Sequence, residues 1–108
     1  MSSVIEIKDS QFDQEVFTAN KPVLVYFWAN WCGPCRLVSP SIQWAADNYS
    51  DGLKVIKMEV DSSPESVAKC GVEGVPALRL YKDNEIVESH EGAIGKQALQ
   101  QLLESGLG

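Results

Sequence analysis

The sequence predicts an α/β domain, in which about four helices flank a mixed central β-sheet of about five strands. Strand-like and helix-like segments alternate along the 108 residues, as expected for parallel strands joined by right-handed helical crossovers. Residues 23–29 form a nearly continuous apolar run, Val-Leu-Val-Tyr-Phe-Trp-Ala, typical of a central strand buried on both faces. Residues 77–81 and 85–88 flank a short polar turn, which predicts an antiparallel hairpin and makes the sheet mixed.

In the first half of the chain, a short strand is expected at residues 4–7. A helix capped by Ser10 should then run to residue 18, because its apolar residues recur near helical spacing. The apolar strand follows, and a long helix extends from about residue 32 to residue 49. Pro40 lies inside this helix, where it removes one backbone hydrogen bond and should introduce a kink.

In the second half, residues 53–60 alternate between apolar and polar side chains, as a half-buried strand does. A Ser-Ser-Pro-Glu sequence at 62–65 predicts a helix start with a hydroxyl cap and a proline in the first turn, and Gly71 should end that helix. The hairpin turn is expected at 82–84. An amphipathic helix over 95–103 closes the chain.

Length and charge limit the classes of function. A chain of 108 residues predicts one domain spanning 1–108. The formal net charge of −6 argues against binding to nucleic acid or to anionic lipid surfaces. No stretch is long enough to span a bilayer, and the N-terminus lacks a basic segment followed by an apolar one. These features predict a cytoplasmic protein with no membrane partner.

The cysteine pair carries most of the chemical information. Trp31-Cys32-Gly33-Pro34-Cys35 places two thiols one turn apart at a helix start. The N–H groups and dipole of a helix N-terminus favour a thiolate at Cys32. Cys35 lies one turn further into the helix and should be more buried. The pair therefore indicates dithiol–disulfide exchange, in which Cys32 attacks a target disulfide and Cys35 resolves the mixed disulfide.

Other interpretations of the pair remain open at this point. Cys70 and His90 would complete a Cys₃His zinc site, but neither belongs to a second paired motif, so we expect no metal. An oxidase or isomerase usually has a more polar pair between its cysteines than Gly-Pro. A redox-independent binding module would use the surface around the thiols and not the thiols themselves.

The chain resembles the thioredoxin family over essentially all of its length. The combination of Trp-Cys-Gly-Pro-Cys with a later Val75-Pro76 is specific, and further matching marks are Phe27-Trp28-Ala29, Arg36, Pro40, Lys57, Asp61, Gly74 and Gly92. The resemblance implies the thioredoxin fold, with Cys32 as the exposed nucleophile and Cys35 as the resolving thiol. It also implies that Pro76 is cis and lies beside the disulfide, so that the backbone at Val75 pairs with substrate like an added strand.

The resemblance further implies the surroundings and partners of the pair. Substrate would dock on a flat apolar patch formed by Trp31, Gly33, Pro34, Gly74, Val75 and Gly92. Trp28 would lie beneath the site with its indole N–H near Asp61. The family likeness implies a monomer that binds no cofactor. It would be recharged by a thioredoxin reductase, NADPH-linked or ferredoxin-linked, and would reduce disulfide-containing target proteins.

Tyr26 departs from the family pattern, because thioredoxins usually carry a buried aspartate at this place. A phenol has a pKa of about 10 and is a poor base near neutral pH. One interpretation is that Tyr26 is only a core aromatic. Lys57 has lost its usual acid partner, and Glu59 lies two residues along the same strand and hence on the same face. We therefore hypothesise that the proton of Cys35 leaves through water or through a Lys57–Glu59 pair.

Cys70 and two carboxylates are the other departures. Cys70 precedes Gly71 at a helix end, where it is either a small buried apolar residue or an exposed, regulatory thiol. Glu73 and Glu91 flank the segments that carry Pro76 and Gly92. Both should lie near the rim of the docking patch, where their charge would favour targets with basic rims.

Overall fold

The computed structural model describes residues 4–108, and five strands form one mixed sheet in the order β1-β3-β2-β4-β5. β1 (Val4–Glu6) and β2 (Val23–Trp28) both pair in parallel with β3 (Lys54–Glu59). β4 (Ala77–Lys82) is antiparallel to β2 and to β5 (Glu85–Glu91). The mixed sheet expected from the sequence is therefore confirmed, with the apolar strand β2 at its centre.

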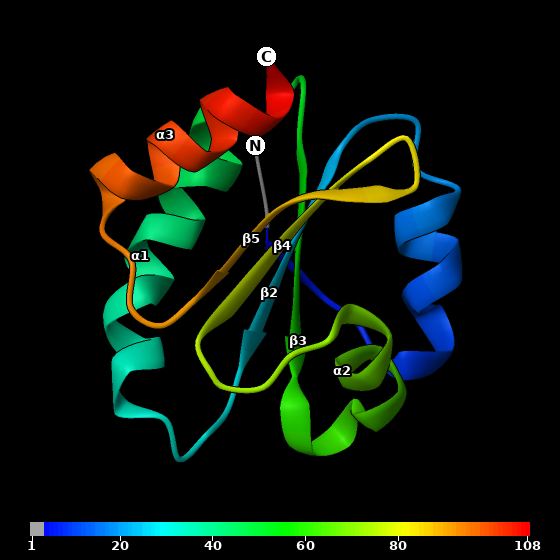
Figure 1. Ribbon diagram of the computed structural model, residues 1–108, viewed down its shortest axis with the longest axis vertical. Coiled ribbons are helices and arrows are strands. Elements are labelled where there is room, and N and C mark those ends of the chain that lie inside the picture. The colour runs from blue at the N-terminus through cyan, green and yellow to red at the C-terminus, as the bar shows by residue number, and fades with distance from the viewer. Residues whose placement is uncertain (1–3) are drawn as a thin grey trace.

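Helices cover both faces of the sheet (Figure 1). α1 (Gly33–Asn48) and α3 (Lys96–Leu107) pack on one face. A short helical segment at residues 9–17 and α2 (Pro64–Cys70) pack on the other. Alternate side chains of β2 enter the two cores, because successive strand residues point to opposite faces. Leu24 and Tyr26 face α1, whereas Val23, Val25 and Phe27 face the opposite core.

The long helix α1 begins where the cysteine motif predicts. Cys32 is its N-cap residue, and the backbone N–H of Cys35 donates to the Cys32 sulfur at 3.2 Å. Pro34 lies in the first turn, where a helix needs no intrahelical N–H donor. Pro40 lies inside α1, which nevertheless continues to Asn48.

The first helical segment differs from the expected regular helix. Asp9–Gln11 forms a 3₁₀ turn and Asp13–Phe17 forms a π-helical turn, while Lys8 and not Ser10 occupies the cap position. Phe12 and Val16 are buried, so the apolar spacing correctly identified the inward face. The segment is short, and its packing rather than its helix propensity determines its form.

Asp9 provides the cap of α2, which the sequence assigned to the serine pair. Its carboxylate accepts the backbone N–H groups of Glu65 at 3.0 Å and Ser66 at 2.9 Å, and the Ser66 hydroxyl at 2.6 Å. Burial opposes ionisation, but these hydrogen bonds outweigh it and hold the pKa of Asp9 below its ordinary value. Ser63 occupies the N-cap position without a side-chain cap, and its buried hydroxyl has no partner within residues 4–108.

The remaining boundaries follow local signals closely. α2 ends at Gly71, which adopts the left-handed conformation with φ of 64°. Asp83 and Asn84 form the hairpin turn with positive φ values of 55° and 67°. β5 and α3 are both longer than expected, since they extend to Glu91 and Leu107. Within the described part of the chain, no helix is long and apolar enough to cross a membrane.

Candidate active site

The cysteine motif spans the end of the loop that follows β2 and the first turn of α1. Cys32 and Cys35 form a disulfide with their Cα atoms 5.4 Å apart. The exposed fractions of the two residues are 5% and 3%, so the expectation that Cys32 is exposed is wrong for the oxidised form. Ala29, Val60 and Val75 pack against the pair. What distinguishes the two cysteines is position, because Cys32 is the N-cap of α1 and Cys35 lies within its first turn.

The loop between α2 and β4 lies at the same end of the sheet, at the bottom of Figure 1. The Val75–Pro76 peptide bond is cis, as the resemblance implies. Val75 packs against the small cluster of Ala29, Cys32 and Cys35. The backbone N–H of Gly92 donates to the carbonyl of Pro76 at 2.8 Å, which brings the end of β5 to this loop. The topology thus gathers the segments around residues 32, 75 and 92.

A shallow apolar groove of about 220 Å³ borders the cysteine loop. Its lining residues are Trp31, Val60, Val67, Val72, Glu73, Gly74 and Val75. Trp31 is 67% exposed, which is unusual for so large an apolar side chain. Three residues expected in the docking patch line this groove, and Gly33, Pro34 and Gly92 are exposed nearby on the adjoining segments.

The expected contact between Trp28 and Asp61 is absent. Asp61 instead accepts the indole N–H of Trp31, with Nε1 and Oδ2 2.9 Å apart. Trp28 packs in the same core as Tyr26, on the α1 side of the sheet, and its Nε1 atom has no partner within residues 4–108. The Lys57 ammonium lies 5.5 Å from the centre of the Trp28 ring. Asp61 therefore orients the exposed Trp31 rather than the half-buried Trp28.

Tyr26 is a buried hydrogen-bond donor at the site. Its side chain is 2% exposed, and its hydroxyl donates to the carbonyl of Cys35 at 2.9 Å. The Ser39 hydroxyl donates to the same carbonyl at 3.2 Å. Burial raises the pKa of the Tyr26 phenol, although a hydrogen bond with Ser39 opposes the effect. Tyr26 is thus neutral near pH 7 and holds the backbone of Cys35 by direct contact.

A cavity of about 190 Å³ reaches Cys35 from the side of Tyr26. It is lined by Tyr26, Trp28, Ala29, Asn30, Cys35, Arg36, Ser39 and Lys57, a set that contains no carboxylate. The hydroxyl, amide and cationic groups make it polar. Cys35 therefore faces a polar cavity without an internal acid–base group of the usual family type.

Glu59 does not replace the missing aspartate. Its carboxylate accepts the side-chain amide of Asn30 at 2.6 Å and the hydroxyl of Ser62 at 3.3 Å. Lys57 forms no ion pair within the described residues. The two side chains share a strand, but Glu59 ends β3 and turns to the adjoining loops. The hypothesis of a Lys57–Glu59 pair is therefore wrong.

The interpretation of Cys70 as an exposed thiol is also wrong. Cys70 is 4% exposed and its sulfur lies 3.3 Å from the hydroxyl of Tyr81 in the core. Burial raises the pKa of this thiol above its ordinary value. Helix α2 places it on the inner side, among the apolar residues of the second core. In the described part of the chain, no three His, Cys, Asp or Glu side chains cluster as metal ligands.

Burial of Cys70 has a measurable consequence. Titration of the oxidised native protein with an aromatic disulfide reagent should detect no thiol at pH 8, and titration in denaturant should detect one. The reason is that reagent access requires unfolding and that burial disfavours the thiolate. Cys70→Ala supplies the blank. Rapid reaction of one thiol in the native protein would contradict this placement.

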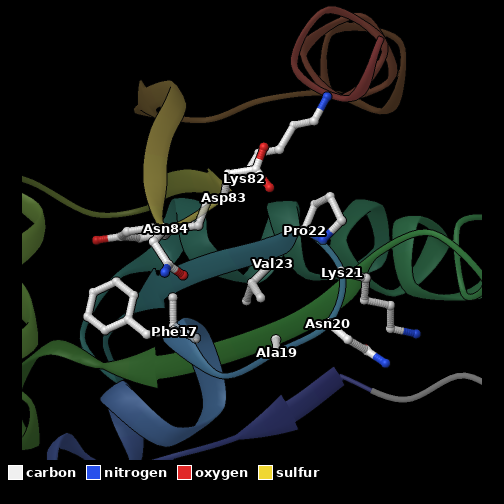
Figure 2. Close-up of a pocket in the computed structure, with 11 residues that line it drawn as sticks. Phe17, Ala19, Asn20, Lys21, Pro22, Val23, Lys82, Asp83 and Asn84 are labelled. Atoms are coloured by element: carbon white, nitrogen blue, oxygen red, sulfur yellow. The ribbon is translucent and has the colours of Figure 1, made fainter.

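A larger cavity lies far from the cysteines (Figure 2). It measures about 350 Å³ and is bounded by residues 16, 17, 19–23 and 81–84. In Figure 2, Asn84 lies above Phe17, and Pro22 and Val23 lie to the right of both. These residues lie at the start of β2 and the end of β4, whereas the disulfide follows the end of β2. Size alone therefore does not identify the reactive centre.

Comparison with known proteins agrees with this geometry. The thioredoxin family model matches residues 3–105. A thioredoxin-like protein of Synechocystis sp. is 60% identical over 105 residues, covering 97% of this chain and 96% of its own. Thioredoxin 1 of Nostoc sp. is 40% identical and covers 99% of this chain and 100% of its own, and the thioredoxin of Pseudomonas aeruginosa is 36% identical with 96% coverage of each. The chain therefore belongs to the thioredoxin family, and it is a thiol–disulfide oxidoreductase that reduces disulfides through its Cys32–Cys35 pair.

Proposed function

We propose that Cys32 is the attacking thiolate and Cys35 the resolving thiol in the reduction of target-protein disulfides. The Cys32 sulfur attacks one sulfur of the target disulfide, that bond breaks, and the other target sulfur leaves as a thiolate. Cys35 loses its proton and attacks Cys32, which releases the second target thiolate and forms the Cys32–Cys35 disulfide. Two electrons pass from the dithiol to the target. The N-cap position of Cys32 supports this order, because a helix N-terminus favours an anion.

We propose that targets dock across the loops around the disulfide. The backbone at Val75, next to the cis Pro76, would pair with the extended target backbone. Trp31, Gly33, Pro34, Gly74 and Gly92 would form the surrounding contact surface. Support comes from the exposed Trp31 and from the apolar groove that Gly74 and Val75 help to line.

We propose that solvent in the polar cavity takes the proton from Cys35. The cavity walls carry no carboxylate, and Tyr26 is a hydrogen-bond donor to the Cys35 backbone. Lys57 lies over the ring of Trp28 and places positive charge near the cavity. Asp61 orients Trp31 through a hydrogen bond. Positive charge beside the cavity favours the Cys35 thiolate.

The proposed partners follow from the electron balance. Each turnover leaves the pair oxidised, so a thioredoxin reductase, NADPH-linked or ferredoxin-linked, must return two electrons.

We propose that the chain acts as a monomeric single domain in the cytoplasm, where glutathione and thioredoxin systems keep thiols reduced. Fractionation followed by thiol trapping would test the location.

An insulin-reduction assay with each reductase in turn tests this function. One reductase system should support continuous reduction, and the chain should turn over many times per molecule. The Cys32→Ser, Cys35→Ser double variant is the control for redox-independent effects. Failure with both reductases, together with failure of the chemically reduced protein to reduce insulin, would overturn the proposal.

A further inference from the structure

Arg79 is a buried charge whose role the redox chemistry does not explain. It lies in the middle of β4 and is 5% exposed. Its guanidinium donates to the carbonyls of Cys70 at 2.8 Å, Leu78 at 2.8 Å and Gly71 at 3.1 Å. A buried guanidinium is costly unless its donors are paired. The pairing ties the C-terminal end of α2, whose carbonyls lack helical partners, to the central part of the sheet.

Glu91 completes the charge pair and extends it to the docking loop. Its Oε2 atom lies 2.7 Å from Nη2 of Arg79 and accepts the backbone N–H of Glu73 at 3.3 Å. The hydrogen bond from Arg79 holds the pKa of Glu91 below its ordinary value, partly opposed by burial and helped by the N–H groups of Glu73 and Gly74. Glu91 is therefore an ionised carboxylate whose charge is paired with Arg79, although its side chain is still 33% exposed.

The pair bears directly on the segment that precedes the cis proline. Glu91 contacts residues 73 and 74. These residues directly precede the cis Val75–Pro76 peptide. Arg79 holds residues 70 and 71 at the start of the same loop. The pair thus holds the chain just before and within residues 72–76, here called the docking segment. Neither charged group touches the cysteine pair, which packs with Val75 instead.

We propose that the Arg79–Glu91 pair is a positioning device that fixes the docking segment in the conformation that protein targets require. This inference rests on the proposed docking of targets along Val75. With the pair intact, a target meets a backbone that is already ordered, so less conformational entropy is lost on binding. Without it, the docking segment must be ordered by each target. A small disulfide needs only access to Cys32 and should not depend on the pair.

The experiment compares two substrates across three variants. Glu91→Gln removes the charge with little change in shape, and Arg79→Lys keeps the charge but loses the branched set of hydrogen bonds. Glu15→Gln is the matched control, because Lys54–Glu15 is a second partly buried ion pair, with side chains 20% and 26% exposed, that includes no residue of the docking segment. Each protein is assayed with insulin and with hydroxyethyl disulfide, and its urea midpoint is measured.

We expect kcat/KM for insulin to fall roughly tenfold in Glu91→Gln and Arg79→Lys, mainly through KM. The rate constant with hydroxyethyl disulfide should stay within about twofold of the parent, and Glu15→Gln should change neither rate. Hydrogen exchange of the backbone amides of Glu73 and Gly74 should become faster in both test variants. This measurement reports on the order of the docking segment directly, even if a variant is too unstable for its activity to be compared.

Equal losses with the two substrates, or unchanged insulin kinetics with only a lower urea midpoint, would show that the pair is merely structural and overturn the inference. If the parent protein reduces hydroxyethyl disulfide but not insulin, the proposed function fails instead. The two failures are therefore distinguishable.

Discussion

Replacing Cys35 by serine should stop turnover and leave the protein covalently joined to its target. Replacing Cys32 by serine should prevent both turnover and formation of this mixed disulfide. The first variant retains the attacking sulfur at the N-cap of α1 but has no second sulfur to release the target. Insulin reduction should fall by roughly three orders of magnitude or more in either variant. Only Cys35→Ser should accumulate the mixed disulfide.

Non-reducing electrophoresis and intact-mass measurement of the trapped adduct check this expectation. The experiment is needed because the exposed fractions of the two cysteines, 5% and 3%, do not separate their roles in the oxidised state. Cys70→Ala is the matched control, since it removes the remaining thiol in the core without touching the pair. An adduct that forms with Cys32→Ser and not with Cys35→Ser would reverse the assignment.

Tyr26→Asp should destabilise the protein by about 3 kcal/mol at pH 7. Tyr26 is 2% exposed, packs in the core beneath α1, and donates to the carbonyl of Cys35. Aspartate leaves part of this volume empty and places a charge at a position that is only 2% exposed. Tyr26→Phe is the matched control, because it removes only the hydroxyl and should cost about 1 kcal/mol.

The penalty for Tyr26→Asp should depend on pH. Burial raises the pKa of the new carboxyl in the folded state above its unfolded value, so the folded state binds the proton more tightly. The destabilisation is therefore complete above the folded pKa and shrinks as pH falls below it. Urea midpoints at pH 7 and pH 4 measure this difference. A variant more stable than the parent at pH 7 would contradict the account of Tyr26 as a favourable buried donor.

The same variant tests proton transfer in the second chemical step. A carboxylate at position 26 would border the cavity that reaches Cys35 and supply a base of a kind that the residues lining this cavity do not include. The pH profile of mixed-disulfide resolution should therefore shift between the parent and Tyr26→Asp, and Tyr26→Phe should resemble the parent. An identical profile for all three proteins would exclude a proton role at this position.

Local patterns predicted most of the fold and the centre of the site. The apolar run at 23–29 identified the central strand, because a strand covered on both faces buries nearly every side chain of such a sequence. Asp83 and Asn84 marked the hairpin turn, and Gly71 marked the end of α2, since each tolerates positive φ. The Cys-Gly-Pro-Cys motif located the redox pair at a helix start.

Contacts between distant segments were not predictable from the sequence in the same way. Asp9 caps α2 across 56 residues, and Asp61 binds Trp31 in place of Trp28. Glu59 turns to Asn30, and Cys70 is buried against Tyr81. Each outcome depends on how a side chain is directed after the sheet and helices have packed. Spacing along one strand or one helix indicates the face on which a side chain lies, but not which distant group it contacts.

The chain thus determines by itself where its strands, helices and thiols lie, because backbone preferences and apolar periodicity act over a few residues. The surroundings of those thiols are decided only when separate segments meet. Tyr26 reaches the Cys35 carbonyl through the packing of β2 against α1, and Glu91 reaches the docking segment through the return of β5 beside β4. Burial strengthens these few polar contacts, because breaking one would leave a buried polar group without a hydrogen bond, which costs folding free energy. Each group therefore holds its partner firmly in place.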